Sequence, residues 1–464
     1  MMVANNITEL VGRTPMVKIN KLIGPGAAKV YAKLEFLNPG GSIKDRVGLS
    51  MIEAAEKKGL IKPGYTIVEP TSGNTGVGLA MVSAVKGYQV IFTIPDKMSK
   101  EKIDILKAFG AKVIVTPTAV SPDDPANNVQ MAKRISKEMP NAFNPNQYFN
   151  PSNPEAHYRT TGPEIWEQMG GKVDALVAGM GTGGTITGTA RYLKEKNPSI
   201  KVVGVDPEGS IFHHEFYGTK GEIHTYKVEG IGEDFMPSSL DLKLVDEVIV
   251  VSDKDAFLTA RKLAREEGIF AGGSSGAAVF AAKQVAERLG PDRTIVVILP
   301  DTGRNYLNRI YSDEWMIENG YLESEEEQIP VRDIISAKPR RVHSLMAARP
   351  EDRLYEALAV MQENGISQLP VVEGGVQVGS IRELTIMNKL ARHEASLGQK
   401  VREVLDDPLP SVNVKDSILN PFTLLKDKNA AVVVDNGRVV DIITSTDVIN
   451  YFVKEKLPGQ KVMA

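Results

Sequence analysis

The sequence has 464 residues, which is more than one ordinary domain accommodates, so at least two domains are expected. Lys and Arg (55) nearly balance Asp and Glu (58), and the formal net charge of -3 argues against nucleic acid or an anionic membrane as the main partner. Cysteine is absent, which excludes disulfides, thiolate nucleophiles and cysteine-ligated metals. No secretory signal pattern is present, and no apolar run reaches the ~18 residues of a membrane helix, so we expect a cytoplasmic protein without a membrane partner.

Up to about residue 320, short apolar runs alternate with amphipathic helical patterns. This alternation predicts the α/β class, with parallel sheets covered by helices on both faces. Ligands of such sheets bind in the strand-to-helix loops beyond the carboxyl ends of the strands, so chemistry is expected there. The expected strands are 66–70, 90–95, 111–117, 174–180, 201–207 and 294–301.

The last third of the sequence carries an internal repeat. "VRDII" at 331 corresponds to "VREVL" at 401, and 369–387 corresponds to 431–449. Two copies of one unit that cannot bury its apolar face alone are expected to pack as a pair. An acidic stretch before them is interpreted as a linker. The expected boundaries are 1–320 for a catalytic domain, 321–330 for the linker, 331–464 for the module, and about 331–395 and 401–455 for its two repeats.

"GMGTGGTITG" follows an expected strand and opens a helix, and it allows two functional interpretations. Gly179, Gly181 and Gly184 form a GxGxxG, and Asp206 ends the next strand about 20 residues later, which is the dinucleotide pattern of a nicotinamide enzyme. Alternatively, Gly181 to Thr185 form a phosphate cup, in which backbone N–H groups and Thr hydroxyls converge at a helix N-terminus. A glycine turn without a ligand is the third interpretation.

Two further glycine-rich loops also precede expected helices. In "EPTSGNTG", Thr71, Ser72, Asn74 and Thr75 concentrate small donors that suit a small carboxylate, and Asn74 can reach a ring oxygen. In "GGSSG", the hydroxyl of Ser274 can bond to a heterocyclic nitrogen. The structural alternative for both loops is an ordinary helix N-cap.

"PGGSIKDR" places Lys44 at the start of an expected helix, directly after a glycine-rich stretch. A nicotinamide enzyme needs no such lysine. A pyridoxal phosphate enzyme does, because the amine forms a Schiff base and then acts as a base, for which its pKa must fall. The alternative is an exposed lysine at a helix end.

With "PGGSIKDR", "EPTSGNTG", "GTGGT" and "GGSSG" in this order, the sequence resembles the fold type II pyridoxal phosphate enzymes of the cysteine synthase and cystathionine β-synthase family, over roughly residues 5–315. The resemblance implies two doubly wound α/β subdomains. It implies Lys44 as the Schiff-base lysine, Asn74 as partner of the cofactor's phenolic oxygen and Ser274 as partner of its pyridine nitrogen. Gly40 and Gly41 would let the backbone pass close to the cofactor. The implied phosphate cup consists of Gly181, Thr182, Gly183, Gly184 and Thr185.

The resemblance also implies a reaction. Residues 71 to 75 and Gln147 would hold a substrate carboxylate, Gly230 would contribute to the substrate site, and Tyr148 would sit beside the β-carbon as a catalytic residue. A serine cannot keep the pyridine nitrogen protonated, so the cofactor is a weaker electron sink and β-replacement is favoured over transamination. An amino acid would displace Lys44, which then removes the α-proton. The β-substituent leaves, an aminoacrylate remains, and a thiol adds to it.

"KVEGIGEDFMPSSLD" (227–241), with Asp234 and Phe235, resembles the cystathionine β-synthases more than the cysteine synthases, although Glu233 stands where animal and fungal relatives usually have tyrosine. We therefore expect L-cystathionine from L-homocysteine and L-serine or an O-acylserine. A cysteine synthase that uses sulfide is the alternative, and an NAD-dependent oxidoreductase is a more distant one. Animal relatives hold haem through cysteine and histidine, so haem by that route is not expected here. His213 and His214 are interpreted as a surface or packing pair, and no metal site is expected.

The repeat resembles the tandem CBS (Bateman) module, which in relatives binds adenosyl compounds. Thr444 and Asp447 fit the ribose-binding Thr-x-x-Asp, whereas the first repeat departs from it with Arg382 and Thr385. We expect one regulatory adenosyl site, with S-adenosylmethionine as its ligand, and a homodimer or higher homo-oligomer. A structural or dimer-forming module is the alternative, and a catalytically silent adenosyl-binding regulator is a third class of function.

Overall fold

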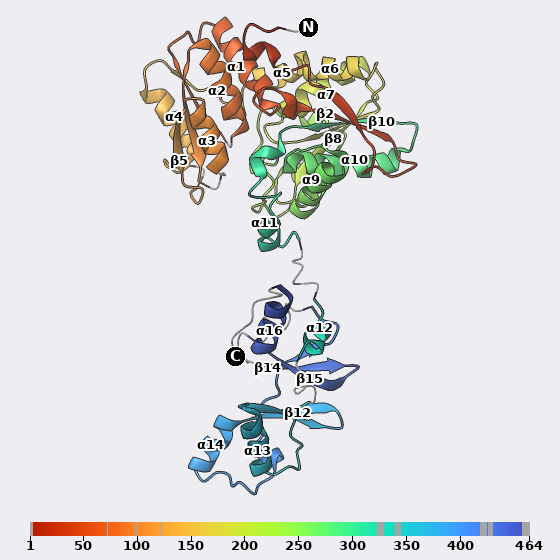
Figure 1. The fold of residues 1–464 in the computed structure, drawn as a ribbon. Helices are drawn as coiled ribbons and strands as arrows, with labels where there is room; N and C mark the ends of the chain where they lie inside the picture. The colour runs from red at the N-terminus through yellow and green to blue at the C-terminus, as the bar shows by residue number, and fades with distance from the viewer. Residues whose placement is uncertain are drawn as a thin grey trace. The chain divides into compact units, whose positions relative to one another are not determined.

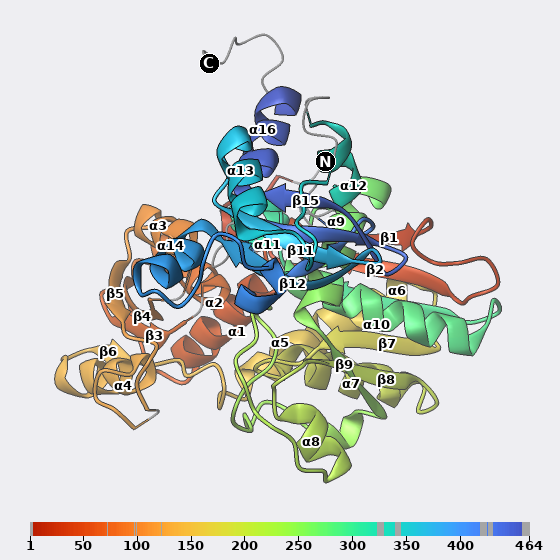
Figure 2. The ribbon, with the colours of Figure 1, turned by 90° about the horizontal axis from the view of Figure 1, so that it is seen from below.

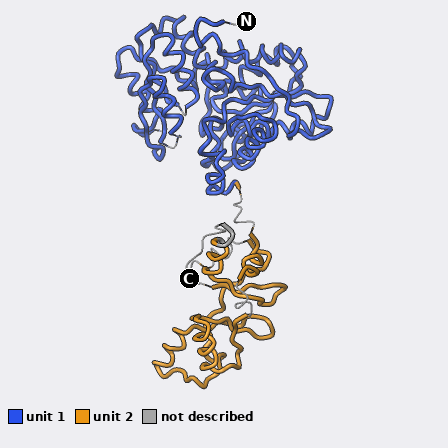
Figure 3. Tube along the Cα trace, in the orientation of Figure 1, with its two compact units in different colours: residues 1–321 blue, residues 322–464 orange. Residues whose placement is uncertain are grey.

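The chain forms two units, residues 1–321 and 322–464, each described here by itself (Figures 1 and 3). The computed structural model describes residues 3–71, 73–96, 98, 100–121, 123–322, 329–338, 345–417, 425 and 430–456. Among the helices of these residues, none combines the length and apolar character that a membrane-spanning segment needs.

The larger sheet of the first unit has the strand order β1-β2-β10-β7-β8-β9. Its strands are β1 (Met16–Ile19), β2 (Lys29–Leu34), β7 (Ala175–Gly179), β8 (Lys201–Pro207), β9 (Glu247–Val251) and β10 (Thr294–Leu299). β1 is an antiparallel edge strand, and the other neighbours are parallel. The accompanying helices are α5 (Ser152–Arg159), α6 (Thr161–Gln168), α7 (Gly184–Lys196), α8 (Phe212–Tyr217), α9 (Asp253–Glu267), α10 (Gly273–Leu289) and α11 (Asp313–Glu318).

The smaller sheet is parallel throughout and has the order β5-β4-β3-β6. It consists of β3 (Thr66–Pro70), β4 (Gln89–Pro95), β5 (Lys112–Thr116) and β6 (Ala142–Phe143), with helices α1 (Lys44–Lys57), α2 (Asn74–Lys86), α3 (Lys100–Ala108) and α4 (Asn128–Glu138). In Figures 1 and 2 alike, this sheet with α3 and α4 lies to one side of the larger sheet. Each sheet has its own core, around Val202 and Val296 in the larger and Ile67 and Phe92 in the smaller. The expected α/β class with two doubly wound halves is confirmed.

The crossing of α1 and α2 sets the position of the lysine that begins α1. The two helices approach so closely that a Cβ on Gly78 would lie 2.6 Å from the carbonyl oxygen of Lys44. A Cβ on Gly48 would lie 2.7 Å from the carbonyl carbon of Gly78. Since real Cβ atoms need more than about 3 Å, only glycine fits both sites. The first turn of α1 therefore lies directly on α2, which begins at Asn74.

The second unit contains two small sheets. β11 (Gln368–Glu373) pairs with β12 (Val376–Arg382), and β14 (Ala430–Asp435) pairs with both β13 (Ser411–Asn413) and β15 (Arg438–Thr444). Its helices include α12 (Val331–Ser336), α13 (Leu354–Asn364), α14 (Glu383–Ala391) and α16 (Ser445–Lys456).

The two repeats exchange their first segments. Val331 and Ile334, at the start of the first repeat, lie in the core around β14 and β15. Val401 and Val404, at the start of the second repeat, lie in the core around β11 and β12. Neither core is complete without a segment from the other half of the module, which is a physical reason for the repeats to occur as a pair.

We predict that Gly78→Ala lowers the free energy of unfolding by about 1–3 kcal/mol, because the added methyl group must push α1 away from α2. Urea denaturation measures the effect. Gly24→Ala is the matched control, since no described heavy atom lies within 4 Å of its added Cβ. Equal stability of Gly78→Ala and the control would show that the crossing tolerates a methyl group.

Candidate active site

The backbone before Lys44 is attached to the carboxyl end of β10. Ile43 N–H donates to Pro300 O at 2.8 Å, and Thr302 N–H donates to Gly41 O at 3.1 Å. Gly41 has φ +83°, and a Cβ there would lie 3.3 Å from Thr302 Cγ2. A Cβ on Gly40 would lie 2.5 Å from the Asp45 carboxylate. Contacts within the protein thus favour glycine at both positions, and the close approach of a cofactor to them stays a prediction.

One cavity brings the lysine and the glycine-rich loop together. Gly230 and Ile231 cover the loop, since a Cβ on Gly181 would lie 2.8 Å from Gly230 O. Among the described residues, Gly184, Asn74 and Ser274 are not part of this lining. The expected site residues that line the cavity are Lys44, Gly181, Thr182, Gly183, Thr185 and Gly230.

The geometry of the loop fits a phosphate group. Gly183 caps α7 with φ +82°, and a side chain on it would overlap Leu240. The first N–H groups of α7 have no carbonyl of an earlier turn to bond, and the helix dipole adds positive potential at this end. The cup is closed on its other side, because a Cβ on Gly184 would overlap Asn153 Oδ1. A tetrahedral anion therefore fits against backbone N–H groups and the hydroxyls of Thr182 and Thr185.

Helix α5 supports this cup with two residues that the sequence analysis did not single out. Asn153 Nδ2 donates to Thr182 Oγ1 at 3.0 Å. His157 Nε2 lies 3.3 Å from Thr185 Oγ1, and its Nδ1 lies 2.9 Å from Thr161 Oγ1. Burial, with the positive charges of nearby basic side chains, holds the pKa of His157 well below its usual range. The imidazole is therefore neutral at the cup.

Asn74 and the loop that precedes Ser274 both contact a residue that the sequence analysis also missed. Asn74 Nδ2 donates to Asp301 Oδ2 at 2.8 Å. Gly272 N–H, two residues before Ser274, donates to Asp301 O at 3.1 Å. Ser274 itself is buried in the first turn of α10. Asp301 lies two residues after the apolar strand β10, and a polar residue at the carboxyl end of such a strand is a signal that could have identified it.

The proposed carboxylate-binding loop is held by its own side chains. Thr71 Oγ1 accepts the N–H groups of Gly73 and Gly76, at 3.0 and 3.1 Å, as in the N-cap interpretation. Thr75 Oγ1 donates to Gln147 Oε1 at 2.6 Å, so these two expected site residues are in contact. Ser72 lies outside the described residues.

Tyr148 packs against the stretch that distinguished the subfamilies in the sequence. Its ring meets Phe235 edge to face with 5.1 Å between centroids. Burial raises the pKa of the Tyr148 phenol well above its usual range, and the Glu233 carboxylate, which also hydrogen-bonds it, adds to this effect. Tyr148 is therefore a neutral hydrogen-bonding group at neutral pH.

The electrostatics of Lys44 suit an amine that must lose its proton. Burial lowers the pKa of the Lys44 ammonium, and the carboxylates of Asp301 and Glu233 act in the opposite direction. A depressed pKa increases the fraction of free amine, which is the form that acts as nucleophile or base.

The dinucleotide interpretation is not favoured by the position of its acidic residue. Asp206 is fully buried and accepts the N–H of His213 at 2.8 Å, at the start of α8. Its carboxylate thus accepts a backbone N–H at the start of α8 and is not exposed to a ribose. His213 and His214 pack edge to face with 5.4 Å between centroids. Within the described parts of the chain, no group of three or more His, Asp or Glu side chains is arranged to hold a metal ion.

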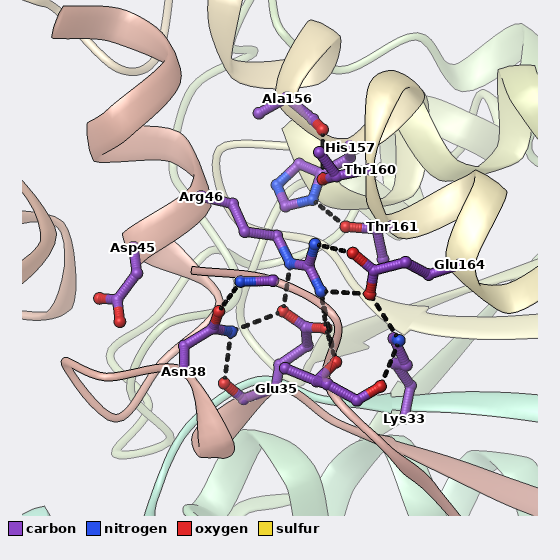
Figure 4. A network of polar contacts seen from close by, with 12 residues as sticks. Lys33, Glu35, Asn38, Asp45, Arg46, Ala156, His157, Thr160, Thr161 and Glu164 are labelled. Carbon is purple, nitrogen blue, oxygen red and sulfur yellow. Dashed lines mark hydrogen bonds and ion pairs between the residues drawn. The ribbon is translucent and has the colours of Figure 1, made fainter. Parts of the chain in front are cut away.

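A buried ion network anchors the first turn of α1 (Figure 4). The guanidinium of Arg46, two residues after Lys44, lies between Glu35 and Glu164 at 2.7 and 2.6 Å. Lys33 Nζ bonds the other oxygen of Glu164 at 2.7 Å. Arg46 and the other cation together lower the pKa of Glu164 to about 2, despite its burial. The network connects α1, β2 and α6.

In the second unit, Thr444 and Asp447, the expected ribose-binding pair, are hydrogen-bonded to each other. Thr444 N–H and Oγ1–H both donate to Asp447 Oδ2, at 2.8 and 2.7 Å. The buried ammonium of Lys338 lies 3.7 Å from the same carboxylate and 3.0 Å from Asp441. In the first repeat, Thr385 at the position of Asp447 instead donates to Asp406, at 3.1 Å.

Fold and site define an α/β enzyme with a buried lysine beside a phosphate-binding loop, and comparison with known proteins agrees. The family model "Pyridoxal-phosphate dependent enzyme" matches residues 7–301, and "CBS domain" matches 330–392 and 401–454. Cystathionine beta-synthase of Dictyostelium discoideum is 39% identical to this chain, over 98% of this chain and 93% of the relative. Cystathionine beta-synthase of Mus musculus is 42% identical, over 92% of this chain and 77% of the relative. This chain therefore belongs to the pyridoxal-phosphate dependent enzyme family, with CBS domains after its catalytic unit.

Shorter relatives match the catalytic unit. Cysteine synthase of Staphylococcus aureus is 47% identical over 66% of this chain and 96% of its own. The solved O-acetylserine dependent cystathionine beta-synthase from Helicobacter pylori is 41% identical, with a TM-score of 0.62 over 67% of this chain and 100% of that chain. A hydrogen sulfide-producing enzyme from Fusobacterium nucleatum is 42% identical, with the same TM-score over 66% of this chain and 100% of its own.

We predict that Glu164→Gln lowers the free energy of unfolding by about 3–5 kcal/mol at neutral pH, because it leaves Arg46 and Lys33 short of a counter-charge in a buried site. The pKa of Glu164 falls from 4.5 to about 2 on folding, so its ionisation stabilises the native state above pH 4.5. That stabilisation, about 3 kcal/mol, is lost as the pH falls from 4.5 to 2.

Denaturation at several pH values measures this change, and the difference between wild type and variant should shrink with acidification. Glu155→Gln is the matched control, because Glu155 pairs with Arg159 and Arg191 at the surface. Surface pairs contribute about 0–1 kcal/mol, so the control should stay close to wild type. Equal effects of the two variants would contradict a special role for the buried network.

Proposed function

We propose that this enzyme is a pyridoxal phosphate-dependent lyase that forms L-cystathionine from L-homocysteine and L-serine or an O-acylserine by β-replacement. The observation that carries the proposal is that Lys44 and the loop of Gly181 to Thr185 face one cavity. The cradle of glycines at the start of α7 fits the cofactor's phosphate. Relatives named cystathionine beta-synthase align along nearly the whole chain, including its second unit.

Three sets of residues would hold the cofactor. The cup of Gly181, Thr182, Gly183, Gly184 and Thr185 would take the phosphate, Asn74 the phenolic oxygen, and Ser274 the pyridine nitrogen. When bound, pyridoxal phosphate supplies an electron sink for bonds at the substrate's α-carbon. Because Ser274 carries no charge, it leaves that sink weaker than an aspartate would, which suits loss of a β-substituent.

The remaining roles fall to side chains around the substrate. The amine of Lys44, whose pKa burial lowers, would hold and return the proton of the α-carbon. Residues 71–75 and Gln147, the latter already bonded to Thr75, would hold the substrate carboxylate. Gly230 would border the substrate at the edge of the cup. The neutral phenol of Tyr148 would stand beside the β-substituent.

The choice of substrates rests on two lines of support. The stretch 227–241 resembles the cystathionine β-synthases, and Tyr148 packs on its Phe235. The Helicobacter pylori relative is described as O-acetylserine dependent, which supports an O-acylserine as donor beside serine. The second candidate is a cysteine synthase acting with sulfide, which the Staphylococcus aureus and Fusobacterium nucleatum relatives of the catalytic unit support.

We predict that Lys44→Ala abolishes the visible absorption of the bound cofactor and lowers cystathionine formation by about 10²–10⁴-fold, because no other group returns the α-proton. Absorption spectra and a coupled assay measure the two effects. Lys57→Ala, an exposed residue at the end of the same helix, is the matched control and should behave as wild type.

A panel of donors and acceptors tests the substrates. Homocysteine with serine or O-acetylserine should give cystathionine. Efficient formation of cysteine from sulfide without any cystathionine from homocysteine would replace the first proposal with the second.

We further propose that the second repeat binds S-adenosylmethionine through Thr444 and Asp447, and that the enzyme is a homodimer, as its family resemblance implies. The carboxylate of Asp447 caps the start of α16, where it accepts two hydrogen bonds from Thr444. Ribose hydroxyls would be further donors to the same group. The second unit would then act as a regulatory module.

Asp447→Ala should weaken S-adenosylmethionine binding by about 1.5–3 kcal/mol, the contribution of a hydrogen bond to a charged group. Isothermal titration calorimetry measures it. Thr385→Ala, at the corresponding position of the first repeat, is the matched control and should leave the affinity unchanged. An unchanged affinity of Asp447→Ala, or an equal loss in the control, would remove the assignment.

A further inference from the structure

Asp301 lies at the junction of the loops that carry Lys44, Asn74 and Ser274. It follows β10, and its residue is 1% exposed. Its backbone pairs with Ser42 on one side, and its carbonyl oxygen accepts the N–H of Gly272 on the other. It is thus bonded to the segments that lead into α1 and α10.

The carboxylate of Asp301 is held in one place. Oδ2 accepts Asn74 Nδ2–H at 2.8 Å and the hydroxyl of Tyr306 at 2.6 Å. Any side chain at Gly272 would overlap Oδ1, so that residue must be glycine for the carboxylate to stay. Oδ1 is buried and has no hydrogen-bond partner within the described residues.

Burying the carboxylate of Asp301 costs free energy of folding, so a contribution to stability does not explain its presence. Desolvation raises the pKa of Asp301, while the hydrogen bonds from Tyr306 and Asn74 and the charge of Lys102 act to keep it ionised. A buried polar atom without a partner destabilises a fold, and an apolar residue of similar size would avoid the penalty. A function at this position is the more economical explanation.

Oδ2 of Asp301 accepts the hydroxyl of Tyr306 and is therefore an acceptor, whereas the amide of asparagine has a donating and an accepting end. Asp301 therefore selects the orientation in which Nδ2 of Asn74 faces it, because the reverse orientation would set two acceptors against each other. Within the described part of the chain, this is the hydrogen bond that fixes the Asn74 amide. The second N–H of Nδ2 is then available to another acceptor.

We propose that Asp301 is a positioning residue that fixes the Asn74 amide with its donating end toward the phenolic oxygen of pyridoxal phosphate. The proposal rests on the cofactor role given to Asn74 above. Asp301 touches neither cofactor nor substrate, and its effect passes through Asn74. Charge-assisted hydrogen bonds are the stronger kind, so the carboxylate holds the amide more firmly than a neutral residue would.

The test is a double-mutant cycle on the full-length holoenzyme. Asp301→Asn keeps the shape of the side chain but can both donate and accept, so it no longer selects one orientation of Asn74. We expect the affinity for the cofactor to fall by about 5–30-fold and the visible absorption maximum to shift. In an Asn74→Ala background, the same substitution should change cofactor affinity less than about twofold, because the residue it acts through is gone.

Tyr306→Phe is the matched control. It removes the other hydrogen bond to the same oxygen, Oδ2, and leaves Asn74 in contact with the carboxylate. Because the Tyr306 hydroxyl also favours the ionised form of Asp301, cofactor affinity should fall in this variant by less than in Asp301→Asn, and the absorption maximum should shift less. Thermal unfolding of the apo forms would report any general loss of structure.

Three results would overturn the proposal. The first is an equal loss of affinity from Asp301→Asn with and without Asn74. The second is a spectral shift in Tyr306→Phe as large as in Asp301→Asn. The third result needs no variant and so applies even if Asp301→Asn does not fold. In wild-type enzyme labelled with ¹⁵N-asparagine, the NMR signal of the Asn74 amide would stay in place when the cofactor is added. Failure of the proposed function would look different, since Lys44→Ala would then keep its visible band or wild type would bind no cofactor.

Discussion

The pairing of backbone at the carboxyl end of β10 is the constraint on which the rest of the site depends. The hydrogen bonds from Ile43 to Pro300 and from Gly272 to Asp301 attach the starts of α1 and α10 to one short segment. The side chain of Asp301 adds the start of α2 through Asn74. Three helix starts that are far apart in sequence thereby acquire fixed positions around one point. α2 follows a strand of the smaller sheet and α10 follows another helix, so these hydrogen bonds, and not a shared sheet edge, connect the three helix starts.

Buried charge is used here for placement more than for stability. Arg46, between Glu35 and Glu164, fixes the first turn of α1 (Figure 4). The close glycine contacts with α2 restrict the same turn. An apolar cluster of the same volume would be at least as stable, but it would not fix the direction of the turn. The same reasoning applies at the cup, where the neutral His157 and Asn153 set the two threonine hydroxyls. The proposed chemistry needs such fixed groups, because small displacements of reacting groups cost large factors in rate.

The second unit follows a different principle. Its two repeats are alike in sequence, yet each core contains the first segment of the other repeat, with Val331 in one and Val401 in the other. A ligand bound at Asp447 would touch a carboxylate whose neighbour, Lys338, comes from the exchanged segment. Ligand binding in the second repeat would therefore act on a carboxylate that is paired with the exchanged segment of the first repeat.

The sequence by itself determined the α/β class and the repeat, because periodicity and repeated segments are signals that need no tertiary structure. It predicted Lys44 and the glycine loop as parts of one site, and both line one cavity. It also predicted Thr75 and Gln147 as members of one site, and they are in contact. The approach of the cofactor to Gly40 and Gly41 stays a prediction. The sequence analysis passed over Asp301, Asn153, His157 and Arg46. Each of these four residues has a partner more than 25 positions away, and no local pattern encodes such pairs. Only the tertiary structure decided them, since burial and charge pairing are properties of the packed chain.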